Sequence, residues 1–557
     1  MRDGVHLSTD VFLPVGPGPF PAVLFRTPYE SSDDRWTSWA GVLASHGYAA
    51  VVQDCRGRYE SEGVFYAYHQ EGPDGVDTLR WIRAQPWSNG RVGGWGRSYG
   101  GLFQWLMARE GEDQLTCMAP HVIPADYYHE VAYIGGAFQL AHGLLSAILY
   151  ITARTFVTSP ASLQLFNAPE NLARLPLIDL DVMSIGKRIS YWRDWLEHPI
   201  YDEYWKAITW TRSYDRIDAP IFQHGGWFDP YAGSALMSFS GMSAGGGSER
   251  ARRNQRVMIG PTAHPEPSTS VQGELDFGHH AFVDIREEEL RWFDHHLKGL
   301  DTGYEAEPPV SLFVMGRNEW RGEYEWPLSR ATEIAYYLHS GGKANTLNGD
   351  GTLDREAPSN EEPDRFTYDP ADPVYTVGGN NSIDMLTLGW ERPILAGPAD
   401  QRPIETRQDV LVYTSRPLET EVEVTGPVEL ILYVASSARD TDFTAKLIDV
   451  FPDGRSMNLA EGILRTRYRD SFTRLELLVP NEPVELRIRL NPTCNVFLPG
   501  HRIRVDISSS NFPRFSRNLN TGEDIATGTR MQVARQTVLH SSAYPSRILL
   551  PVVPTGG

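Results

Sequence analysis

The stretch Gly93-Gly94-Trp95-Gly96-Arg97-Ser98-Tyr99-Gly100-Gly101 decides how the first half of this chain folds. The apolar run from Val92 to Trp95 predicts a strand, and apolar residues that recur at helical spacing from Leu102 predict a helix. The Gly-x-Ser-x-Gly pattern between them fits a sharp strand-to-helix turn, because larger residues at the two glycine positions would collide with neighbouring strands. This turn lifts the Ser98 hydroxyl out of the sheet and aims the Tyr99 N–H at any oxyanion that forms there. We therefore predict that Ser98 is a catalytic nucleophile.

The same pattern occurs a second time, at Gly241-Met242-Ser243-Ala244-Gly245. This copy opens a Gly-rich loop, with no strand expected before it and charged residues rather than a helix expected after it. Because the pattern has a catalytic meaning between a strand and a helix, we do not expect Ser243 to be a nucleophile.

Strands and helices alternate on both sides of the Ser98 turn. Most of the expected strands are apolar throughout, which is typical of a parallel sheet that helices cover on both faces. The pattern predicts an α/β core in two parts, residues 1–126 and residues 219–330. The expected strands cover residues 5–13, 21–25, 48–53, 92–95, 117–123, 220–225 and 256–260, and the expected helices cover residues 39–45, 71–84, 231–239 and 282–298, with Gly299 as the last cap.

Residues 127–218 contain no convincing strand pattern and are rich in aromatic side chains. A helical insertion between two strands of the sheet predicts a cap domain. We expect most of the aromatic side chains to pack in its core and some to line a pocket over the carboxyl edge of the sheet. These aromatic residues are Tyr127, Tyr128, Tyr133, Phe138, Tyr150, Trp192, Trp195, Tyr201, Tyr204, Trp205 and Trp210.

Beyond residue 330 the helical patterns stop and short alternating runs take their place. Turn residues such as Asp369-Pro-Ala-Asp-Pro373 separate these runs. Regular short strands with turns between them predict an antiparallel β-sandwich over residues 331–557, and we favour a jelly roll. The clearest runs cover residues 422–424, 428–434, 484–490 and 503–507.

A serine nucleophile needs a base to take its proton, and the base needs an anion to fix its tautomer. In sheets of this kind the three groups lie at the carboxyl ends of different strands, in the chain order serine, acid, histidine. Asp229 follows the first strand after the insertion, and His264 follows the next one. We predict that both complete a triad with Ser98, although Asp229 also suits the N-terminus of the helix after it. The alternatives to His264 are His224, which fits a core position better, His279 and His280.

An oxyanion hole needs two hydrogen-bond donors, and the Tyr99 backbone N–H is one of them. Tyr29 lies at the end of an early strand, behind Pro28, and can supply a phenol hydroxyl as the second. From the residues alone, a tyrosine that only packs at the strand end explains Tyr29 equally well.

The composition narrows the classes of partner. The chain has 557 residues and a formal net charge of −20, so it lacks the basic surface that nucleic acids and anionic membranes require. Three widely spaced cysteines make neither a disulfide framework nor a zinc site. Neither a membrane-spanning stretch nor a signal peptide is visible, which predicts a cytoplasmic protein and leaves residues upstream of Met1 open. We expect no metal and no organic cofactor.

Four motifs carry a resemblance: Arg26-Thr27-Pro28-Tyr29, Gly96-Arg97-Ser98-Tyr99-Gly100-Gly101, Gly225-Gly226-Trp227-Phe228-Asp229 and Gly260-Pro261-Thr262-Ala263-His264. Together they resemble the cocaine esterase and X-Pro dipeptidyl-peptidase superfamily of serine hydrolases, and its cocaine esterase branch in particular. Residues 440–454, 495–503 and 508–513 are similar to the C-terminal jelly roll of that family. The resemblance implies an α/β-hydrolase core with an inserted helical cap and a jelly roll. It also implies that the Tyr29 hydroxyl serves the oxyanion hole.

The resemblance also bears on the substrate. Members that act on α-amino acid esters bind the substrate ammonium with carboxylates, one of them soon after the Ser-Tyr pair. Here Gly100, Gly101 and Leu102 follow, so we expect no recognition of an amino group. The cocaine esterase branch recognises an aromatic acyl group through apolar and aromatic side chains, which makes Trp227, Phe228 and Tyr231 candidate pocket residues.

We predict a serine-dependent carboxylic-ester hydrolase that forms an acyl-enzyme and acts on small esters with apolar or aromatic acyl groups. One alternative is hydrolysis of amides, as an acylase, an amidase or an X-Pro dipeptidyl-peptidase. The other is a non-catalytic binding protein that uses the jelly roll. The expected partner is a small-molecule ester, with no nucleic acid and no membrane, and a homodimer is left open.

Overall fold

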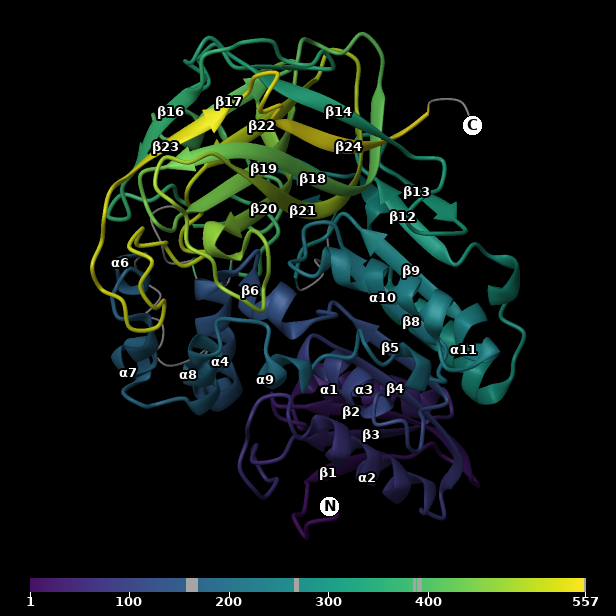
Figure 1. Ribbon diagram of the computed structural model, residues 1–557. Coiled ribbons are helices and arrows are strands. Elements are labelled where there is room, and N and C mark those ends of the chain that lie inside the picture. The colour runs from purple at the N-terminus through teal and green to yellow at the C-terminus, as the bar shows by residue number, and fades with distance from the viewer. Residues whose placement is uncertain (157–168, 265–269, 384–386, 388–392, 555–557) are drawn as a thin grey trace.

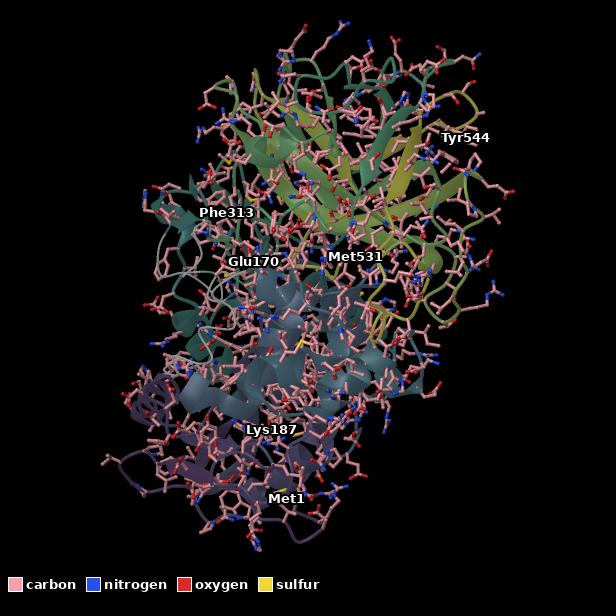
Figure 2. The ribbon with its side chains drawn as sticks, turned by 90° about the vertical axis from the view of Figure 1, so that its left-hand side faces the viewer. Met1, Glu170, Lys187, Phe313, Met531 and Tyr544 are labelled. Atoms are coloured by element: carbon pink, nitrogen blue, oxygen red, sulfur yellow. The ribbon has the colours of Figure 1, made fainter. Side chains whose placement is uncertain are left out.

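The computed structural model describes residues 1–156, 169–264, 270–383, 387 and 393–554. Figure 1 shows a sheet with helices on it around the N-terminus, a group of helices beside it, and a β-sandwich above both that carries the C-terminus. Figure 2 shows the same three regions after a quarter turn, with Lys187 and Glu170 on the helical region. Within the described ranges, no helix is long and apolar enough to cross a membrane.

The first region is built on a sheet that has nine strands in the described part of the chain. The edge strands β1 and β13 run antiparallel to their neighbours, and the strands between them pair in parallel, as predicted for an α/β core. The strand that leads to Ser98 lies near the middle. In spatial order the strands are β1 (Thr9–Phe12), β3 (Ala49–Asp54), β2 (Phe20–Thr27), β4 (Ser88–Arg97), β5 (Cys117–His121), β8 (Ile221–Gly226), β9 (Gln255–Gly260), β12 (Val310–Val314) and β13 (Glu319–Glu323).

Helices cover both faces of this sheet. On β2, Ala22 and Leu24 belong to the core that contains side chains of α2 and α3, whereas Val23 and Phe25 belong to the core that contains side chains of α1 and α12. Successive strand residues point to opposite faces, which explains the continuous apolar runs. The helices are α1 (Asp34–Ser45), α2 (Glu71–Arg83), α3 (Tyr99–Ala108), α10 (Ala232–Gly245), α11 (Glu249–Arg253) and α12 (Ile285–Phe293), and η5 (Asp294–Lys298) continues α12 up to Gly299.

A short non-helical stretch, residues 246–248, does follow Gly241–Gly245, but the expectation that no helix comes after it is wrong. The Gly241–Gly245 segment forms the last turns of α10, and α11 begins four residues later, at Glu249. A Cβ atom at Gly241 would lie 2.1 Å from the ring of Tyr214, so a glycine is needed there for close packing rather than for a turn. Ser243 therefore lies within a helix and not at a strand-to-helix turn.

The helical region has a core that is rich in large aromatic side chains. Trp192, Trp195, Trp205 and Trp210 are fully buried. The expectation that residues 127–218 hold no strand is wrong in one place, where β6 (Tyr133–Ile134) and β7 (Ala137–Phe138) form a small hairpin. Two-residue strands are too short to give an alternating pattern. The helices are α4 (Leu140–Phe156), α6 (Pro169–Leu172), α7 (Leu180–Ile185), α8 (Ser190–Glu197) and α9 (Glu203–Lys206), with the π-helical turn η1 (Tyr128–Ala132) before β6.

The C-terminal region is a β-sandwich of mostly antiparallel strands, with the short helix α14 (Arg402–Glu405) among them. The two runs expected at residues 422–424 and 428–434 are one strand, β18, bulged between Gly426 and Val428, where Pro427 interrupts the ladder. The strands are β14 (Thr332–His339), β15 (Thr352–Asp354), β16 (Asp364–Tyr368), β17 (Leu411–Thr414), β18 (Val422–Ser436), β19 (Asp442–Val450), β20 (Ser456–Arg465), β21 (Val484–Phe497), β22 (Arg502–Ser508), β23 (Ala534–Leu539) and β24 (Arg547–Val553).

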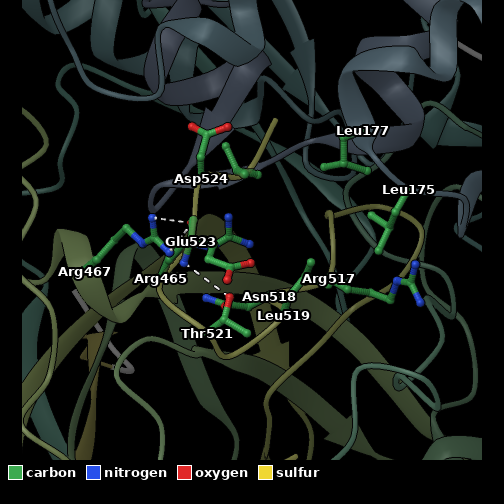
Figure 3. A pocket seen from close by; sticks show the side chains of 11 residues that line it. Leu175, Leu177, Arg465, Arg467, Arg517, Asn518, Leu519, Thr521, Glu523 and Asp524 are labelled. Carbon is green, nitrogen blue, oxygen red and sulfur yellow. Dashed lines mark hydrogen bonds between the residues drawn. The ribbon is translucent and has the colours of Figure 1, made fainter. Parts of the chain in front are cut away.

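The helical region docks on the sandwich along a polar seam. A cavity of about 20 Å³, which has room for a water molecule, lies there between Leu175 and Leu177 on one side and Arg465 and Arg467 on the other (Figure 3). Near this seam the β6–β7 turn meets β20, because the Arg465 N–H donates to the Gly135 carbonyl at 2.8 Å.

Gly135→Ala should loosen this docking. The residue has φ +52°, and a Cβ atom would lie 1.8 Å from the Ile463 carbonyl oxygen, so backbone would have to move. We expect a loss of about 3 kcal/mol or more in unfolding free energy, seen as a lower melting temperature. Gly186→Ala is the matched control, since Gly186 has φ +67° with open space around its Cβ position and should lose about 1 kcal/mol. Equal losses in both variants would contradict the docking role.

Candidate active site

Ser98 lies in the turn between β4 and α3, in a backbone conformation that residues other than glycine rarely adopt. Its φ is 52° and its ψ is −129°, and its N–H donates to the carbonyl of His121 at 3.0 Å. A Cβ atom at Gly96 would lie 2.0 Å from the Gly100 carbonyl oxygen, and one at Gly100 would lie 2.3 Å from the Phe25 ring. The glycines are therefore needed for the close approach of backbone that fixes Ser98 above the sheet.

Asp229 and His264 lie together at the carboxyl ends of neighbouring strands. Asp229 follows β8 and is fully buried, while His264 follows β9, the parallel neighbour of β8. Nδ1 of His264 lies 2.8 Å from Oδ2 of Asp229, and Oδ1 of Asp229 accepts the Tyr231 N–H at 2.7 Å. The Asp229 carboxylate thus bonds the backbone at the start of α10 and also lies against the His264 imidazole. The carboxylate fixes the proton of His264 on Nδ1, which leaves Nε2 as the basic atom.

Tyr29 lies two residues beyond β2, with its backbone fixed. Its N–H donates to Oγ1 of Thr27 at 2.9 Å. Its hydroxyl contacts the side chain of Ser98 and the hydroxyl of Tyr150, which comes from α4 in the helical region. Burial raises the pKa of the Tyr29 phenol well above its usual value. The hydroxyl therefore stays protonated and can act as a donor next to Ser98.

The side chain of Tyr99 holds this residue in place, and its backbone N–H is the first one after Ser98. The Tyr99 hydroxyl donates to Oε1 of Glu71 at 3.0 Å and accepts the Tyr68 N–H at 3.0 Å. Glu71 is paired with Arg26 at 2.7 Å, and both side chains are buried. A buried ion pair with further hydrogen bonds holds its members in one arrangement. Through Glu71, the pair therefore fixes Tyr99 and with it the start of α3.

Tyr231 lies beside the imidazole of His264, with ring centroids 5.8 Å apart. Its hydroxyl lies 2.8 Å from Nε2 of His142, and Nδ1 of His142 lies 2.7 Å from Oγ of Ser382. Helix α4, the loop after β8 and the C-terminal half of the chain therefore meet at His142. Ser146, one turn further along α4, lies 3.5 Å from the same Nε2.

The structure places the expected pocket residues Trp227 and Phe228 in a core and leaves their role in a pocket as a prediction. Both side chains are fully buried in the core shared with the sandwich, where Nε1 of Trp227 donates to the Phe313 carbonyl at 2.8 Å and Phe228 packs against Phe277. Of the three expected pocket residues, Tyr231 is the one that lies beside His264.

Four further residues around Ser98 escaped the sequence analysis as site residues: Glu71, Tyr68, His142 and Tyr150. Tyr150 was visible as one of many aromatic residues of the insertion, and nothing in its spacing separates a core tyrosine from one whose hydroxyl contacts that of Tyr29. Glu71 sits at the start of a helix, where a carboxylate has an ordinary structural role. Of the alternatives to His264, His224 lies buried within β8, and His279 and His280 are exposed.

Known proteins resemble this chain over its whole length. Residues 3–266 match the X-Pro dipeptidyl-peptidase (S15) family, and residues 302–549 match the X-Pro dipeptidyl-peptidase C-terminal non-catalytic domain. Cocaine esterase of Rhodococcus sp. (strain MB1 Bresler) is 38% identical, in an alignment covering 99% of this chain and 97% of that protein.

Two solved structures share the fold at 26% identity. An aminopeptidase from the marine sediment archaeon Thaumarchaeota archaeon has a TM-score of 0.84 and covers 100% of this chain and 95% of its own. An α-amino acid ester hydrolase has a TM-score of 0.80 and covers 99% of this chain and 95% of its own.

His142→Gln should flatten the dependence of stability on pH. Burial, and then the charge of His264, lower the pKa of His142 from 6.5 to about 3. Between these values the unfolded chain binds a proton that the folded chain does not, so the unfolding free energy falls with falling pH by up to about 1.4 kcal/mol per pH unit. Urea denaturation between about pH 6 and pH 4 should show a smaller slope in the variant. His279→Gln, at an exposed histidine, is the control, and equal slopes in wild type and His142→Gln would contradict the assignment.

Proposed function

Because this chain belongs to the X-Pro dipeptidyl-peptidase (S15) and cocaine esterase family and is a serine hydrolase, we propose that it hydrolyses carboxylic esters through an acyl-enzyme on Ser98. The observation that carries the assignment of residues is the 2.8 Å contact between His264 and Asp229. It joins a base and an anion at the ends of β9 and β8, and β8 is the neighbour of β5, whose end holds the Ser98 backbone.

In the proposed reaction Oγ of Ser98 attacks the ester carbonyl while Nε2 of His264 takes its proton. Asp229 stabilises the imidazolium that results, and the proton passes to the oxygen of the leaving alcohol as the acyl–oxygen bond breaks. The Tyr29 hydroxyl and the Tyr99 N–H donate to the carbonyl oxygen as it becomes negative. A water molecule then gives a proton to Nε2 of His264 and attacks the carbonyl of the acyl-enzyme. His264 returns that proton to Oγ of Ser98 as the bond between Oγ and the acyl group breaks and the acid leaves. We assign no metal or cofactor a part in these steps.

We propose small esters with apolar or aromatic acyl groups as substrates, without recognition of an α-amino group. The acidic residues that follow β5 support this choice. Oε2 of Glu130 accepts the N–H groups of Ala125 and Asp126 at 2.6 and 3.0 Å, and Asp126 in turn accepts those of Tyr128 and His129. Burial raises the pKa of Glu130 to about 7, so this carboxyl is a poor partner for a substrate ammonium.

The proposal includes the setting of the enzyme. We propose a core over residues 1–126 and 219–330, a cap over residues 127–218 and a jelly roll over residues 331–557 that covers one side of the site. Three buried free thiols fit the reducing cytoplasm, and the net charge of −20 fits a protein without nucleic-acid or membrane partners. Light scattering after gel filtration measures whether the protein is a monomer or a homodimer.

Ser98→Ala should remove the activity. Loss of the nucleophile leaves no acyl-enzyme, so kcat/KM for a nitrophenyl ester should fall by roughly four orders of magnitude or more. Ser243→Ala is the matched control, because it changes the other Gly-x-Ser-x-Gly copy and should keep kcat/KM within about twofold. A covalent fluorophosphonate probe should label the wild type and the control and leave Ser98→Ala unlabelled. Wild-type turnover in Ser98→Ala would show that the nucleophile lies elsewhere.

A substrate panel should separate ester from amide hydrolysis. We expect kcat/KM for benzoyl and butyryl esters to exceed that for the matching anilides by at least about a hundredfold, because an amine leaves only after protonation by His264. We also expect an α-amino acid ester to be no better than its deaminated analogue. Faster cleavage of the amides would favour the acylase or peptidase alternative, and a clear preference for the α-amino ester would contradict the argument from Glu130.

A further inference from the structure

Tyrosine hydroxyls beside Ser98 form a chain, and the proposed reaction uses one of them. The Tyr127 hydroxyl donates to that of Tyr68 at 2.8 Å, and the Tyr68 hydroxyl donates to that of Tyr150 at 2.7 Å. The Tyr150 hydroxyl contacts that of Tyr29, which reaches Ser98. The chain thus runs from the helical region into the centre where an oxyanion would form.

Tyr29 needs a partner of this kind. Its backbone is fixed, but its hydroxyl lies at the end of a side chain with two rotatable bonds, and the residue is only partly buried. An oxyanion donor is effective when its hydroxyl already points at the position the oxyanion will take. Tyr150 contacts this hydroxyl from the side of the cap, and the two rings lie 6.1 Å apart.

Tyr150 is itself held firmly. It is 6% exposed, and its ring lies 5.1 Å from that of Tyr99 and 6.0 Å from that of Tyr68. Its hydroxyl also bonds to Ser146 on the same helix. A side chain that is packed on two rings and bonded at its tip has little freedom to turn.

Tyr68 connects both proposed oxyanion donors. It is buried and has φ +72°, a conformation that costs energy for a residue with a side chain and persists where the surroundings enforce it. Its N–H donates to the Tyr99 hydroxyl, and Tyr99 supplies the backbone donor. Its own hydroxyl donates to Tyr150, which contacts the other donor, Tyr29.

The direction of the hydrogen bonds favours donation at Tyr29. Since Tyr150 accepts from Tyr68, it can donate onward to the oxygen of Tyr29. A phenol accepts and donates at once, so Tyr29 keeps its own proton for Ser98 or for an oxyanion. Hydrogen bonds in such a chain polarise one another, which makes the last hydroxyl a better donor.

We propose that Tyr150 is a positioning residue of this enzyme, whose hydroxyl holds the Tyr29 phenol in the orientation that stabilises the oxyanion. This inference rests on the proposed roles of Ser98 and Tyr29. It makes the inserted helical region a working part of the oxyanion hole.

A double-mutant cycle tests the inference, with Tyr29→Phe, Tyr150→Phe and the double variant. Tyr29→Phe should lower kcat by about a hundredfold, as the loss of an oxyanion donor does. Tyr150→Phe should lower kcat by roughly tenfold, the value of one hydrogen bond of moderate strength, and should leave KM within about twofold. In the Tyr29→Phe background, Tyr150→Phe should cost less than about twofold, because the hydroxyl it positions has gone.

Tyr191→Phe is the matched control. The Tyr191 hydroxyl is buried in the same region and donates to the Ala147 carbonyl at 2.7 Å, so this variant loses a comparable hydrogen bond away from Tyr29. It should keep kcat within about twofold of wild type. The affinity for an aryl boronic acid, which forms a tetrahedral adduct on serine, should fall about tenfold in Tyr150→Phe and stay unchanged in the control. Melting temperatures show whether each variant is folded.

The outcomes separate this inference from the proposed function. A Tyr150→Phe loss of equal size with and without the Tyr29 hydroxyl would overturn the positioning role, and so would wild-type kcat in Tyr150→Phe. Either result leaves Ser98 and Tyr29 in place if Ser98→Ala and Tyr29→Phe lose activity as stated. If Tyr29→Phe retains wild-type kcat, the assignment of Tyr29 fails, and the inference about Tyr150 fails with it.

Discussion

The contact between the backbone at Gly96 and that at Gly100 is the constraint on which the rest of the candidate active site depends. These two segments can approach because neither carries a Cβ atom, and the approach holds Ser98 at φ 52° and ψ −129°. A conformation of this kind costs about 1–3 kcal/mol. The cost is offset by the core on both sides of β4, including Phe25, whose ring lies against Gly100. Strand, turn and helix therefore place the hydroxyl without any contribution from the side chain of Ser98 itself.

The helical region combines two roles that are usually separate. Several of its tyrosines are core residues whose hydroxyls donate to backbone carbonyls. The Tyr133 hydroxyl donates to the Trp195 carbonyl, and the Tyr191 hydroxyl donates to the Ala147 carbonyl. A buried phenol needs such a partner. Tyr150 meets the same need through the hydroxyls of Tyr68 and Tyr29, two residues outside the helical region. The requirement to satisfy buried hydroxyls has thus produced a polar chain that leads toward Ser98.

The parts of the structure that depend on local sequence pattern could be predicted, and those that depend on distant contacts could not. The elbow strand and helix have their own periodicity, and the parallel neighbours β8 and β9 explain why Asp229 and His264 meet although they are far apart in the chain. The surroundings of Trp227 and Phe228 could not be predicted, because their contacts are with Phe313 of β12 and with Phe277, which come later in the sequence.

The same reasoning covers the other differences. The Gly241–Gly245 segment has the composition of a loop, yet it forms the last turns of α10, where Gly241 packs against Tyr214. The contacts of Tyr150 and His142 depend on which face of α4 meets Tyr29, Tyr231 and Ser382, and this is a property of the docked regions. Residue propensities and hydrophobic periodicity describe single helices and strands, and they contain no information about contacts between regions.

The bond between His142 and Ser382 has a consequence for how such a protein can change over time. His142 belongs to the segment inserted into the core, and Ser382 belongs to the part of the chain that forms the sandwich. A descendant that lost this sandwich, or exchanged it for another, would also lose the Ser382 contact of His142 and so change the surroundings of Tyr231. The helical region and the C-terminal part of the chain are therefore coupled at His142, and a substitution at Ser382 would change the surroundings of Tyr231 and, through it, of His264.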